Sequence, residues 1–395
     1  MHPVDEIRGE GGGSLEGKRI VLGITGSIAA VQCFELSREL VRRGAEVHPV
    51  MTPESGRIVT PCTMRFAAGR APVVELGGEV EHVRLCGESD DRADLLLIAP
   101  CTANTISKVA LGIDDTPVTT MATTAIGTRM PVMVAPAMHA PMYHNPAVMR
   151  NLERLAEMGV DCIDPRFEGG KAKMASVGEI VARVERTLGP RDMAGRRVLV
   201  IGGSSEEPID QMRVITNRGT GETAVSLARA AFARGAEVEL WMGRHQVSLP
   251  DHVALRKFRS VGDLETMLDR VDHDLVMVPA ALSDFGPRQA EGKLPSREGI
   301  TLELEPLPKV LPRIRDRAGV LVGFKAEHGG EELIQKARAR LEEDRLDAVV
   351  ANDLSRVTAG STEVILITRS GSSTLSGDKS KVAHSLLRAI VEELL

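Results

Sequence analysis

The stretch IVLGITGS, residues 20–27, decides the fold of the first half of the chain. Its apolar, partly β-branched run ends in a glycine turn, and an amphipathic helical pattern continues to about residue 43. A strand that ends in glycine lets backbone N–H groups approach an anion, and the positive end of the next helix adds to the attraction. The pattern therefore predicts a strand, a phosphate-binding turn and a helix.

A second stretch of this kind, VLVIGGS at residues 198–204, begins the other half of the chain. Between the two halves, LGPRD at residues 188–192 ends a helical pattern with glycine and proline. A chain of 395 residues is long enough for two domains, each with its own core. We predict a flexible tail at residues 1–17, a first domain at 18–190 and a second domain at 191–395.

Short β-branched runs alternate with amphipathic helical patterns in both halves, which is typical of parallel sheets covered on both faces. The first half has predicted strands at 19–24, 46–51, 95–99 and 132–135, and helices at 27–43, 103–111, 146–158 and 177–187. The second half has predicted strands at 197–201, 237–241, 275–278, 320–324 and 348–351, and helices at 223–234, 261–270 and 331–343. The fold class is therefore α/β, with two doubly wound, mainly parallel, Rossmann-like domains.

Composition excludes several kinds of protein. The formal net charge of −6 and the 2% aromatic content disfavour a nucleic-acid partner. No apolar run is long enough for a membrane span, and the glycine-rich N-terminus lacks the apolar core of a signal peptide. The five cysteines are an odd number without a C-x-x-C pair, so we expect reduced thiols and a cytoplasmic location.

Four polar features of the first half are candidates for one site. They are Gly26-Ser27 at a helix start, His82, Asn104 within APCTANT (99–105), and His139 within PAMHAPMY (136–143). All but His82 follow predicted strands, and loops at the carboxyl ends of parallel strands converge on one crevice.

These segments resemble the flavin-dependent phosphopantothenoylcysteine decarboxylases, whose marks are G-S-I-A-A, a histidine in H-[IV]-x-L, P-A-[ST]-A-N-T and P-x-M-N-x-x-M-W. The resemblance implies a flavodoxin-like domain that binds FMN with its phosphate near Ser27. It further implies that His82 acts on the cysteinyl substrate while the flavin oxidises the thiol. The FMN-binding positions that the resemblance implies are Gly26, Ser27, Thr52, Thr102 and Asn104.

The first half departs from the family pattern at two places. His139 replaces the asparagine that holds the departing carboxylate, and an imidazole can still donate that hydrogen bond. Lys173 stands where the family's flap has a cysteine that protonates the enethiol, so Lys173 or Lys171 is the expected proton donor. If neither donates, the reaction stops at the unsaturated thiol. Met142 is an expected substrate contact, and Tyr143 replaces the family's tryptophan.

The loop at residues 202–221 lacks both G-x-G-x-x-G and the Walker lysine pattern. Arg213, Asn217 and the run Gly219-Thr220-Gly221 are placed to hold an anionic substrate at the start of the next helix. The loop resembles the phosphopantothenate–cysteine ligase motif G-G-T-x-E-P-[IL]-D-x-V-R-x-[IL]-[ST]-N-x-S-S-G. Further segments resemble the same family in order: AALSDF (280–285), Lys293, GFKAE (323–327) and ANDLS (351–355).

The resemblance implies that CTP, with Mg²⁺, activates 4′-phosphopantothenate as an acyl-cytidylate, which cysteine then attacks. Asn217 would stabilise charge in the second step, and Lys293 would neutralise the triphosphate. The expected CTP-binding residues are Ala280, Asp284, Lys293, Phe324 and Arg340. Gly219 replaces a family serine, while Glu222 and Asp344 stand at family lysines, so the choice between CTP and ATP stays open.

Together the two halves resemble the fused bifunctional enzyme of coenzyme A synthesis. The resemblance implies a homo-oligomer with trimeric decarboxylase contacts and dimeric ligase contacts, and small molecules as its substrates. One alternative is an active ligase carrying a flavin-binding scaffold that His139 and Lys173 have disabled. A second alternative is a non-enzymatic flavoprotein regulator. A Rossmann oxidoreductase is disfavoured by the missing dinucleotide fingerprint.

Overall fold

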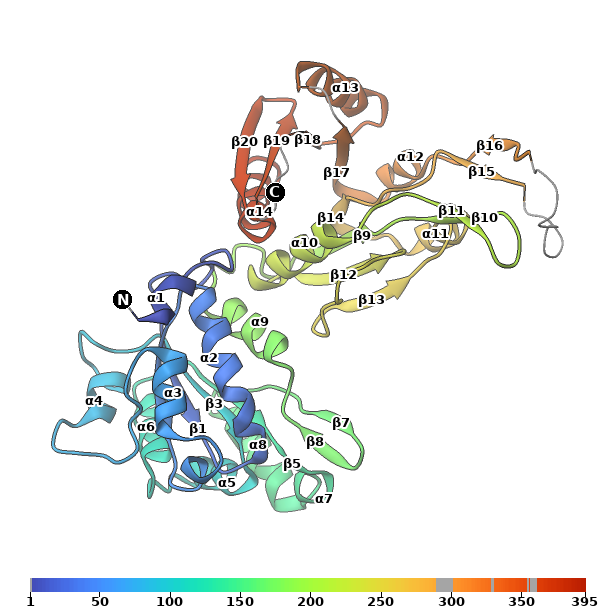
Figure 1. Cartoon of the computed structure of the whole chain (residues 1–395). Helices are drawn as coiled ribbons and strands as arrows, with labels where there is room; N and C mark the ends of the chain where they lie inside the picture. Colours follow the sequence, from blue (N-terminus) through green and yellow to red (C-terminus); the bar gives the residue numbers. More distant parts are fainter. Residues whose placement is uncertain (1, 289–300, 328–329, 354, 356–360) are drawn as a thin grey trace. The chain divides into compact units, whose positions relative to one another are not determined.

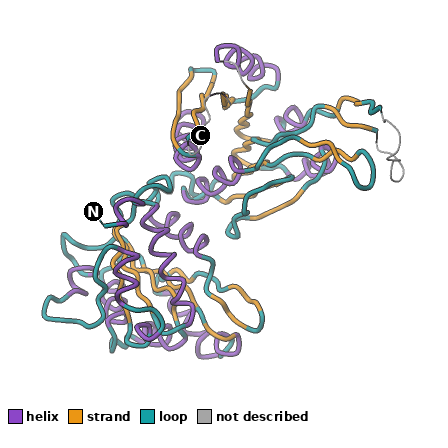
Figure 2. Tube along the Cα trace, viewed as in Figure 1, coloured by secondary structure: helices purple, strands orange, loops and turns teal. Residues whose placement is uncertain are grey.

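Figures 1 and 2 present the computed structural model of the chain, which describes residues 2–288, 301–327, 330–353, 355 and 361–395. The chain folds as two compact units, Met1–Gly189 and Pro190–Leu395, and each is described by itself. In the described part of the chain, no helix is both long and apolar enough to cross a membrane.

The first unit contains a five-stranded sheet of order β2-β1-β3-β4-β6, in which every neighbouring pair is parallel. Its strands are β1 (Arg19–Ile24), β2 (Glu46–Met51), β3 (Leu95–Cys101), β4 (Val132–Pro136) and β6 (Asp161–Cys162). The strand order reverses between β1 and β3, and such a reversal is where open α/β sheets bind their ligands.

Helices cover both faces of this sheet (Figure 1). The helices are η1 (Ile28–Gln32), α2 (Cys33–Arg42), η2 (Ser55–Arg57), α3 (Pro61–Ala68), α4 (Glu81–Cys86), α5 (Ala103–Leu111), α6 (Pro117–Gly127), α7 (Ala140–Tyr143), α8 (Pro146–Glu157) and α9 (Val177–Leu188). Successive side chains of β3 enter opposite cores, with Leu95 and Leu97 in one and Leu96 and Ile98 in the other. A fully buried leucine stabilises such a core by about 1.5–3 kcal/mol. The sheet is therefore doubly wound.

The N-terminal residues pack onto the first unit, which differs from the flexible tail that the sequence predicts. A short helix, α1 (Pro3–Ile7), begins the segment, and Val4 and Leu15 are buried in the same core as α2. The backbone N–H of Leu15 donates to the carbonyl oxygen of Arg43 at 2.8 Å. Val4 and Leu15 therefore attach this segment to the core of the first unit. The glycine and acidic residues around them led to the prediction of a flexible tail.

The second unit contains an eight-stranded sheet of order β13-β12-β9-β14-β17-β18-β19-β20. The pairs are parallel from β13 to β18, and β19 and β20 add an antiparallel edge. The strands are β9 (Arg197–Gly202), β12 (Glu237–Met242), β13 (Ala254–Lys257), β14 (His273–Val278), β17 (Ala318–Glu327), β18 (Ala348–Asp353), β19 (Thr362–Thr368) and β20 (Ser372–Gly377). Both sheets are mainly parallel and confirm the predicted α/β class.

Helices cover both faces of the second sheet as well. One core includes α10 (Glu222–Ala233) and α14 (Lys379–Leu394), and the other includes α11 (Val261–Met267), η3 (Leu268–Arg270), α12 (Val310–Arg315) and α13 (Gly330–Glu343). Two hairpins extend from the loops of this unit: β10 (Glu206–Pro208) with β11 (Val214–Thr216), and β15 (Phe285–Pro287) with β16 (Leu304–Pro306).

Candidate active sites

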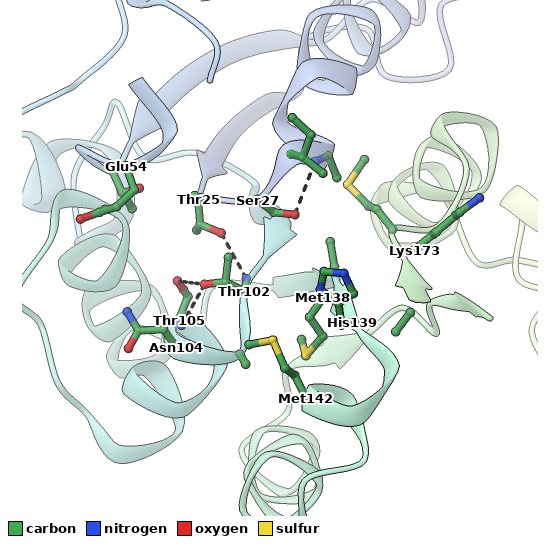
Figure 3. Close-up of a pocket in the computed structure, with 18 of the residues that line it drawn as sticks. Thr25, Ser27, Glu54, Thr102, Asn104, Thr105, Met138, His139, Met142 and Lys173 are labelled. Atoms are coloured by element: carbon green, nitrogen blue, oxygen red, sulfur yellow. Dashed lines mark hydrogen bonds between the residues drawn. The ribbon is translucent and has the colours of Figure 1, made fainter. Parts of the chain in front are cut away.

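A cavity of about 880 Å³ opens in the first unit beyond the carboxyl ends of β1 and β3, at the reversal of the strand order (Figure 3). Most of the predicted first-half site residues line it: Gly26, Ser27, Thr52, Thr102, Asn104, His139, Met142 and Lys173. The volume lies within the roughly 300–1,000 Å³ typical of small-molecule sites. Lys171, the second candidate proton donor, also lines the cavity.

Hydrogen bonds tie together the two loops that form the floor of this cavity. The hydroxyl of Thr25 donates to the carbonyl oxygen of Pro100 at 2.7 Å and accepts from the backbone N–H of Thr102 at 3.1 Å. Thr102 in turn caps α5 by accepting from the backbone N–H of Thr105. Ser27 caps η1 in the same way, through the N–H of Ala29 at 3.4 Å. Both predicted hydroxyls are therefore held at helix starts.

Gly26 allows a close approach between the turn after β1 and the loop after β2. A β-carbon at position 26 would lie 2.6 Å from the β-carbon of Glu54, closer than such atoms come. Glu54 lines the cavity and contributes a carboxylate that the sequence pattern did not indicate. The glycine therefore serves packing of the cavity wall as well as backbone access.

A small antiparallel sheet forms another wall of the cavity. It has the order β5-β8-β7, with β5 (Met138–His139), β8 (Lys171–Lys173) and β7 (Arg166–Glu168). His139 lies opposite Lys171 in this sheet. Gly169 and Gly170 both have positive φ and close the β7–β8 hairpin. The sequence therefore builds the expected flap as a hairpin.

Lys173 is paired within its own hairpin. Its Nζ donates to Oε2 of Glu168 at 2.6 Å, and this hydrogen bond holds the pKa of the Glu168 carboxyl below its usual range. Among the described residues, no cysteine lines the cavity. The cations that line the flap side are Arg166, Lys171 and Lys173.

His82 does not line this cavity, although the sequence places it with the other candidates. It lies on α4, which packs against α6. Its Nδ1 is buried and has no hydrogen-bond partner among the residues that the structure describes. The structure therefore separates His82 from the other first-half candidates within a single subunit.

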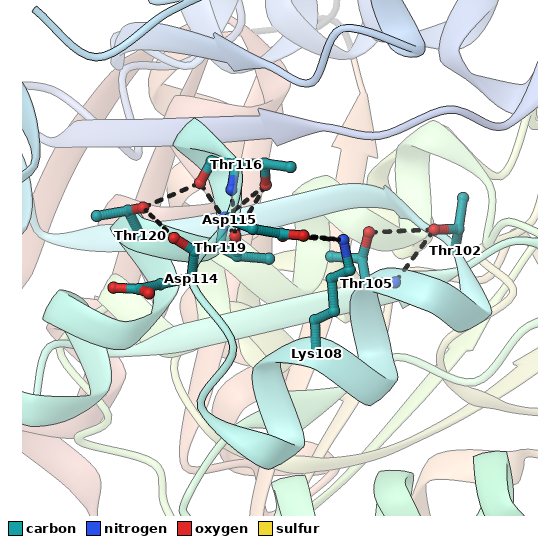
Figure 4. A network of polar contacts seen from close by, with 8 residues as sticks. All are labelled: Thr102, Thr105, Lys108, Asp114, Asp115, Thr116, Thr119 and Thr120. Carbon is teal, nitrogen blue, oxygen red and sulfur yellow. Dashed lines mark hydrogen bonds and ion pairs between the residues drawn. The ribbon is translucent and has the colours of Figure 1, made fainter.

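A polar network at the edge of the cavity was missed from the sequence (Figure 4). The ammonium of Lys108 lies 2.8 and 2.6 Å from the two carboxylate oxygens of Asp115. Thr116 caps α6 together with Thr119, and both of these threonines and Lys108 line the cavity. Lys108 follows Asn104 by four residues on α5, and this helical spacing is the signal that could have found it.

In the second unit, Asn217 contacts the loop that follows β14. Its Nδ2 donates to the carbonyl oxygen of Ala281 at 3.0 Å, next to the predicted nucleotide residue Ala280. Gly219 lies beside the same loop, because a β-carbon there would be 2.7 Å from Oγ of Ser204 and 3.2 Å from the β-carbon of Ala281. Ser204 thus takes the space that a serine at position 219 would need.

The end of this loop leads directly into α10. Gly221 is the N-cap residue, has a φ of +81° and makes no side-chain capping hydrogen bond. The N–H of Glu222 donates to the hydroxyl of Thr220. The Gly219-Thr220-Gly221 run therefore leads into a helix whose N-cap residue has no side chain, and the Thr220 hydroxyl accepts from the first N–H of that helix.

Arg213 is bound within its own turn. Its Nε and Nη2 both donate to Oδ2 of Asp210, at 2.9 and 2.6 Å. The carboxylate of Asp210 is fully buried and also accepts from the N–H of Met212. This pair orients the guanidinium, and leaves it partly exposed at the β10–β11 hairpin.

The remaining described nucleotide candidates are Asp284, in the loop before β15, Phe324, on β17, and Arg340, on α13. Asp284 forms an ion pair with Lys309, which the sequence reasoning missed. Arg340 of α13 donates to the carbonyl oxygen of Phe324 at 3.4 Å and pairs with Asp344 at 3.1 Å. Lys293 lies outside the described residues. Among the described side chains, no group of three or more His, Cys, Asp or Glu is arranged to bind a metal ion.

Comparison with known families agrees with this two-part organisation. Residues 9–189 match the profile of the flavoprotein family, and residues 193–394 match that of the C-terminal domain of the DNA/pantothenate metabolism flavoproteins. The first unit is thus a flavoprotein domain, and the second is a C-terminal domain of the DNA/pantothenate metabolism flavoprotein type.

Two curated relatives match almost the whole chain, and both carry the name coenzyme A biosynthesis bifunctional protein CoaBC. The protein of Thermococcus kodakarensis is 47% identical over 93% of each chain. That of Methanocaldococcus jannaschii is 36% identical over 99% of this chain and 97% of its own. A crystal structure of a CoaBC C-terminal domain is 27% identical, covers 52% of this chain and 98% of its own, and superposes with a TM-score of 0.43.

The chain belongs to the family of bifunctional coenzyme A biosynthesis proteins. It is an enzyme of coenzyme A biosynthesis with a decarboxylase and a ligase activity.

Proposed function

We propose that the first unit is an FMN-dependent phosphopantothenoylcysteine decarboxylase and that the activities divide near residue 190. The cavity supports FMN because its lining combines polar groups for the phosphate and polyol chain with an amide and an apolar side chain for the flavin ring. Hydroxyls at helix starts, from Ser27 and Thr102, suit a phosphate and a polyol chain. Asn104 and Met142 add an amide and an apolar side chain to the lining. The residues present therefore fit FMN.

Bound at this cavity, FMN would supply reversible two-electron chemistry, accepting two electrons from the cysteinyl thiol before the carboxylate is lost as CO₂ and returning them to the enethiol afterwards. His139 would hold that carboxylate by donating a hydrogen bond from its imidazole. Lys173 or Lys171 would donate a proton to the enethiol as it is reduced, since both line the cavity. Glu168 pairs with Lys173 within the hairpin, so substrate binding would exchange this partner.

The location of His82 supports the predicted oligomer. A catalytic histidine outside its own cavity can act only if another subunit presents a cavity to it. Val80 and Val83, on either side of His82, are apolar and about half exposed, at 52% and 43%. We propose that a trimer brings His82 of each subunit to the cavity of a neighbour.

We propose that the second unit joins 4′-phosphopantothenate to cysteine with CTP. The hydrogen bond from Asn217 to Ala281 carries this assignment, because it unites the loop after β9 with the loop after β14. Ala280, Asp284, Phe324, Lys293 and Arg340 would bind the nucleotide, and Arg213, Gly219, Thr220 and Gly221 the acyl substrate. Mg²⁺ would enter with the triphosphate, since the described residues offer no cluster of ligands for it. We place the enzyme in the cytoplasm and its ligase contacts in a dimer.

A coupled assay tests both assignments on the intact enzyme. Purified protein is supplied with FMN, phosphopantothenate, cysteine, Mg²⁺ and either CTP or ATP, and the products are separated. We expect pyrophosphate and CMP from the ligase step, followed by CO₂ and 4′-phosphopantetheine. Consumption of neither nucleotide would remove the ligase assignment, and ligation without CO₂ release would leave the first unit as a flavin-binding scaffold.

A further inference from the structure

The small β5-β8-β7 sheet of the first unit carries its charged side chains on one face. In the register of its strands, Lys171 lies opposite His139 on β5 and opposite Glu168 on β7. Lys173 lies opposite Arg166 on β7. Directly opposed residues, and residues two apart on a strand, share a face of a sheet. Three cationic side chains and one imidazole of this face line the cavity.

Backbone contacts fix the position of Lys171 beside His139. The N–H of Ala140 donates to the carbonyl oxygen of Gly170 at 3.1 Å, which joins the residue after His139 to the residue before Lys171. The β-carbons of directly opposed residues in an antiparallel pair lie about 4.5–5.5 Å apart. The ends of both side chains can therefore contact one small group in the cavity.

Aromatic contacts hold the other face of the β7–β8 hairpin. Phe167 stacks on His144 with the ring centroids 5.4 Å apart, and it meets Tyr143 edge to face at 5.3 Å. Tyr143 is the last residue of α7, which begins directly after His139, and His144 follows it. The hairpin is thus attached to the segment that carries His139, so its register with β5 does not depend on the charged side chains.

Lys171 and Lys173 differ in their partners. Lys173 is bound to Glu168, and in Figure 3 its ammonium points away from His139. Within the described part of the chain, the ammonium of Lys171 and the imidazole of His139 make no hydrogen bond and no ion pair. Lys173 also lies two residues farther along β8, a distance of about 6.8 Å. Lys171 is therefore the lysine that is available beside His139.

We propose that Lys171 and His139 together bind the cysteinyl carboxylate of the substrate, and that Lys171 then protonates the carbon from which this carboxylate has left. The inference rests on the proposed decarboxylase function. An ammonium and an imidazole N–H both donate to a carboxylate, and hydrogen bonds between charged groups are the stronger kind. Two donors thus replace the single asparagine amide of the family pattern.

The chemistry of the substrate places both tasks of Lys171 at one carbon. When CO₂ leaves the oxidised substrate, the electron pair of the broken C–C bond forms the C=C bond of an enethiolate. The saturated thiol then needs a proton on the carbon that lost CO₂ and a hydride on the carbon that bears the sulfur. The hydride is the one that was removed when the thiol was oxidised. The proton comes from Nζ of Lys171, which lies at that carbon because it held the carboxylate.

Two substitutions of Lys171 separate binding from proton donation. Lys171→Met removes the ammonium, so the KM for phosphopantothenoylcysteine should rise about tenfold, and unsaturated thiol should accumulate in place of 4′-phosphopantetheine. Lys171→Arg keeps the positive charge, but a guanidinium does not give up its proton in a protein. We expect Lys171→Arg to have a KM near that of the wild type and still to accumulate the unsaturated thiol. An unchanged KM in Lys171→Met, or saturated product from both variants, would overturn the proposal.

Lys173→Met distinguishes the neighbouring lysine. It removes the partner of Glu168 and should slow turnover by loosening the hairpin, yet the saturated thiol should still match the released CO₂ in amount. If unsaturated thiol accumulates in Lys173→Met and not in Lys171→Met, Lys173 is the proton donor and the proposal falls.

Lys18→Met is the control for the loss of one positive charge from the first unit. Lys18 precedes β1, pairs with Asp94 at 3.6 Å and does not line the cavity. Its KM and its ratio of saturated thiol to CO₂ should equal those of the wild type. A tenfold rise of KM here as well would assign the effect of Lys171→Met to net charge and would contradict the proposed site. The unfolding temperature of the first unit verifies that every variant is folded.

Unreactive analogues keep this test separate from the decarboxylase assignment. Phosphopantothenoylalanine has the carboxylate but no thiol, and the matching ethylamide lacks the carboxylate as well. In calorimetric titrations the wild type should bind the alanine analogue about tenfold more tightly than the ethylamide, and Lys171→Met should bind both equally. Binding to the second unit is common to both proteins and cancels in the comparison.

The titrations decide the carboxylate site even if the enzyme assay fails. Should the wild type release no CO₂, the decarboxylase assignment falls, and a preference for the alanine analogue that disappears in Lys171→Met still supports the site. An equal preference in both proteins, or no preference in the wild type, contradicts it.

Discussion

The hydroxyl of Thr25 accepts a hydrogen bond from the backbone N–H of Thr102 at 3.1 Å, and so joins the loops after β1 and β3 across the reversal in strand order. The same hydroxyl donates to the carbonyl oxygen of Pro100 at 2.7 Å. Thr25 is buried, so water cannot replace it at either bond. Thr25 immediately precedes the family motif that begins at Gly26. Its side chain therefore sets the spacing between that motif and the motif that contains Pro100 and Thr102.

Thr25→Val should weaken FMN binding by about tenfold, because it leaves a buried N–H and a buried carbonyl oxygen unpaired at a cost of about 1–3 kcal/mol. Flavin fluorescence during titration of the flavin-free protein measures the affinity. Thr124→Val is the control, since Thr124 is half-buried and hydrogen-bonded on α6 but does not line the cavity. Equal FMN affinity in the two variants would show that the link between the loops is dispensable.

His82→Asn should lower decarboxylation by about 100-fold to 10,000-fold, the usual contribution of an acid–base group, and leave ligation unchanged. Because His82 lies outside its own cavity, mixed oligomers with an Asn104→Asp variant should regain activity that neither parent shows. Rates of CO₂ release before and after subunit exchange measure this. Arg84→Gln, on the same helix, is the control, and wild-type decarboxylation by His82→Asn would refute the assigned role.

Asn217→Asp should permit activation of the carboxylate and slow amide formation by about 100-fold. The substitution replaces the Nδ2 donor with an oxygen that repels the carbonyl oxygen of Ala281. Rapid-quench experiments should detect a burst of pyrophosphate and an accumulated acyl-cytidylate before the slow appearance of the amide. Equal rates of pyrophosphate release and amide formation would place the role of Asn217 elsewhere.

Gly219→Ser, which restores the residue that the ligase resemblance expects, should destabilise the second unit by about 1–3 kcal/mol. The new β-carbon would lie 2.7 Å from Oγ of Ser204, so Ser204→Ala in the same chain should recover most of the loss. Trp241 emission during urea unfolding follows the second unit selectively. Additive effects of the two substitutions would mean that the contact with Ser204 is not the cause.

The sequence predicted the parts of the fold that local pattern determines. The run of β1 is mainly apolar and partly β-branched, β2 contains the β-branched Val47 and Val50, and their predicted bounds, 19–24 and 46–51, agree with the structure. The small sheet of β5, β7 and β8 was missed because strands of two or three residues have no periodicity to detect. Its position depends instead on the pairing of distant residues, which sequence pattern does not encode.

The same distinction between local pattern and tertiary contact applies to the candidate site residues. Ser27, Thr102 and Asn104 follow strands in recognisable motifs, and the structure brings them to one cavity. Lys108 and Thr25 contribute to that cavity through contacts with residues far along the chain or on another turn, and no motif marked them. His82 lies in a motif but outside the cavity, since a motif names a residue without saying which surface it faces.

His48 should make the first unit lose stability as the pH falls. Burial, with further contributions from Arg84 and Arg19, lowers the pKa of His48 to about 4. The unfolded chain has a histidine pKa near 6.5, so between about pH 6.5 and 4 the unfolded state takes up a proton that the folded state refuses. The contribution of His48 is therefore fully present above that window and is lost within it.

From pH 7.5 to pH 4.5 this one group should cost the first unit about 2–3 kcal/mol. His48→Gln, which is neutral at every pH, should flatten the dependence of the first-unit transition in calorimetry of the full chain. The second unit serves as the internal control, because Trp241 lies within it and reports its transition separately. If His48→Gln shifts both transitions alike, or neither, the acid sensitivity of the first unit does not originate at His48.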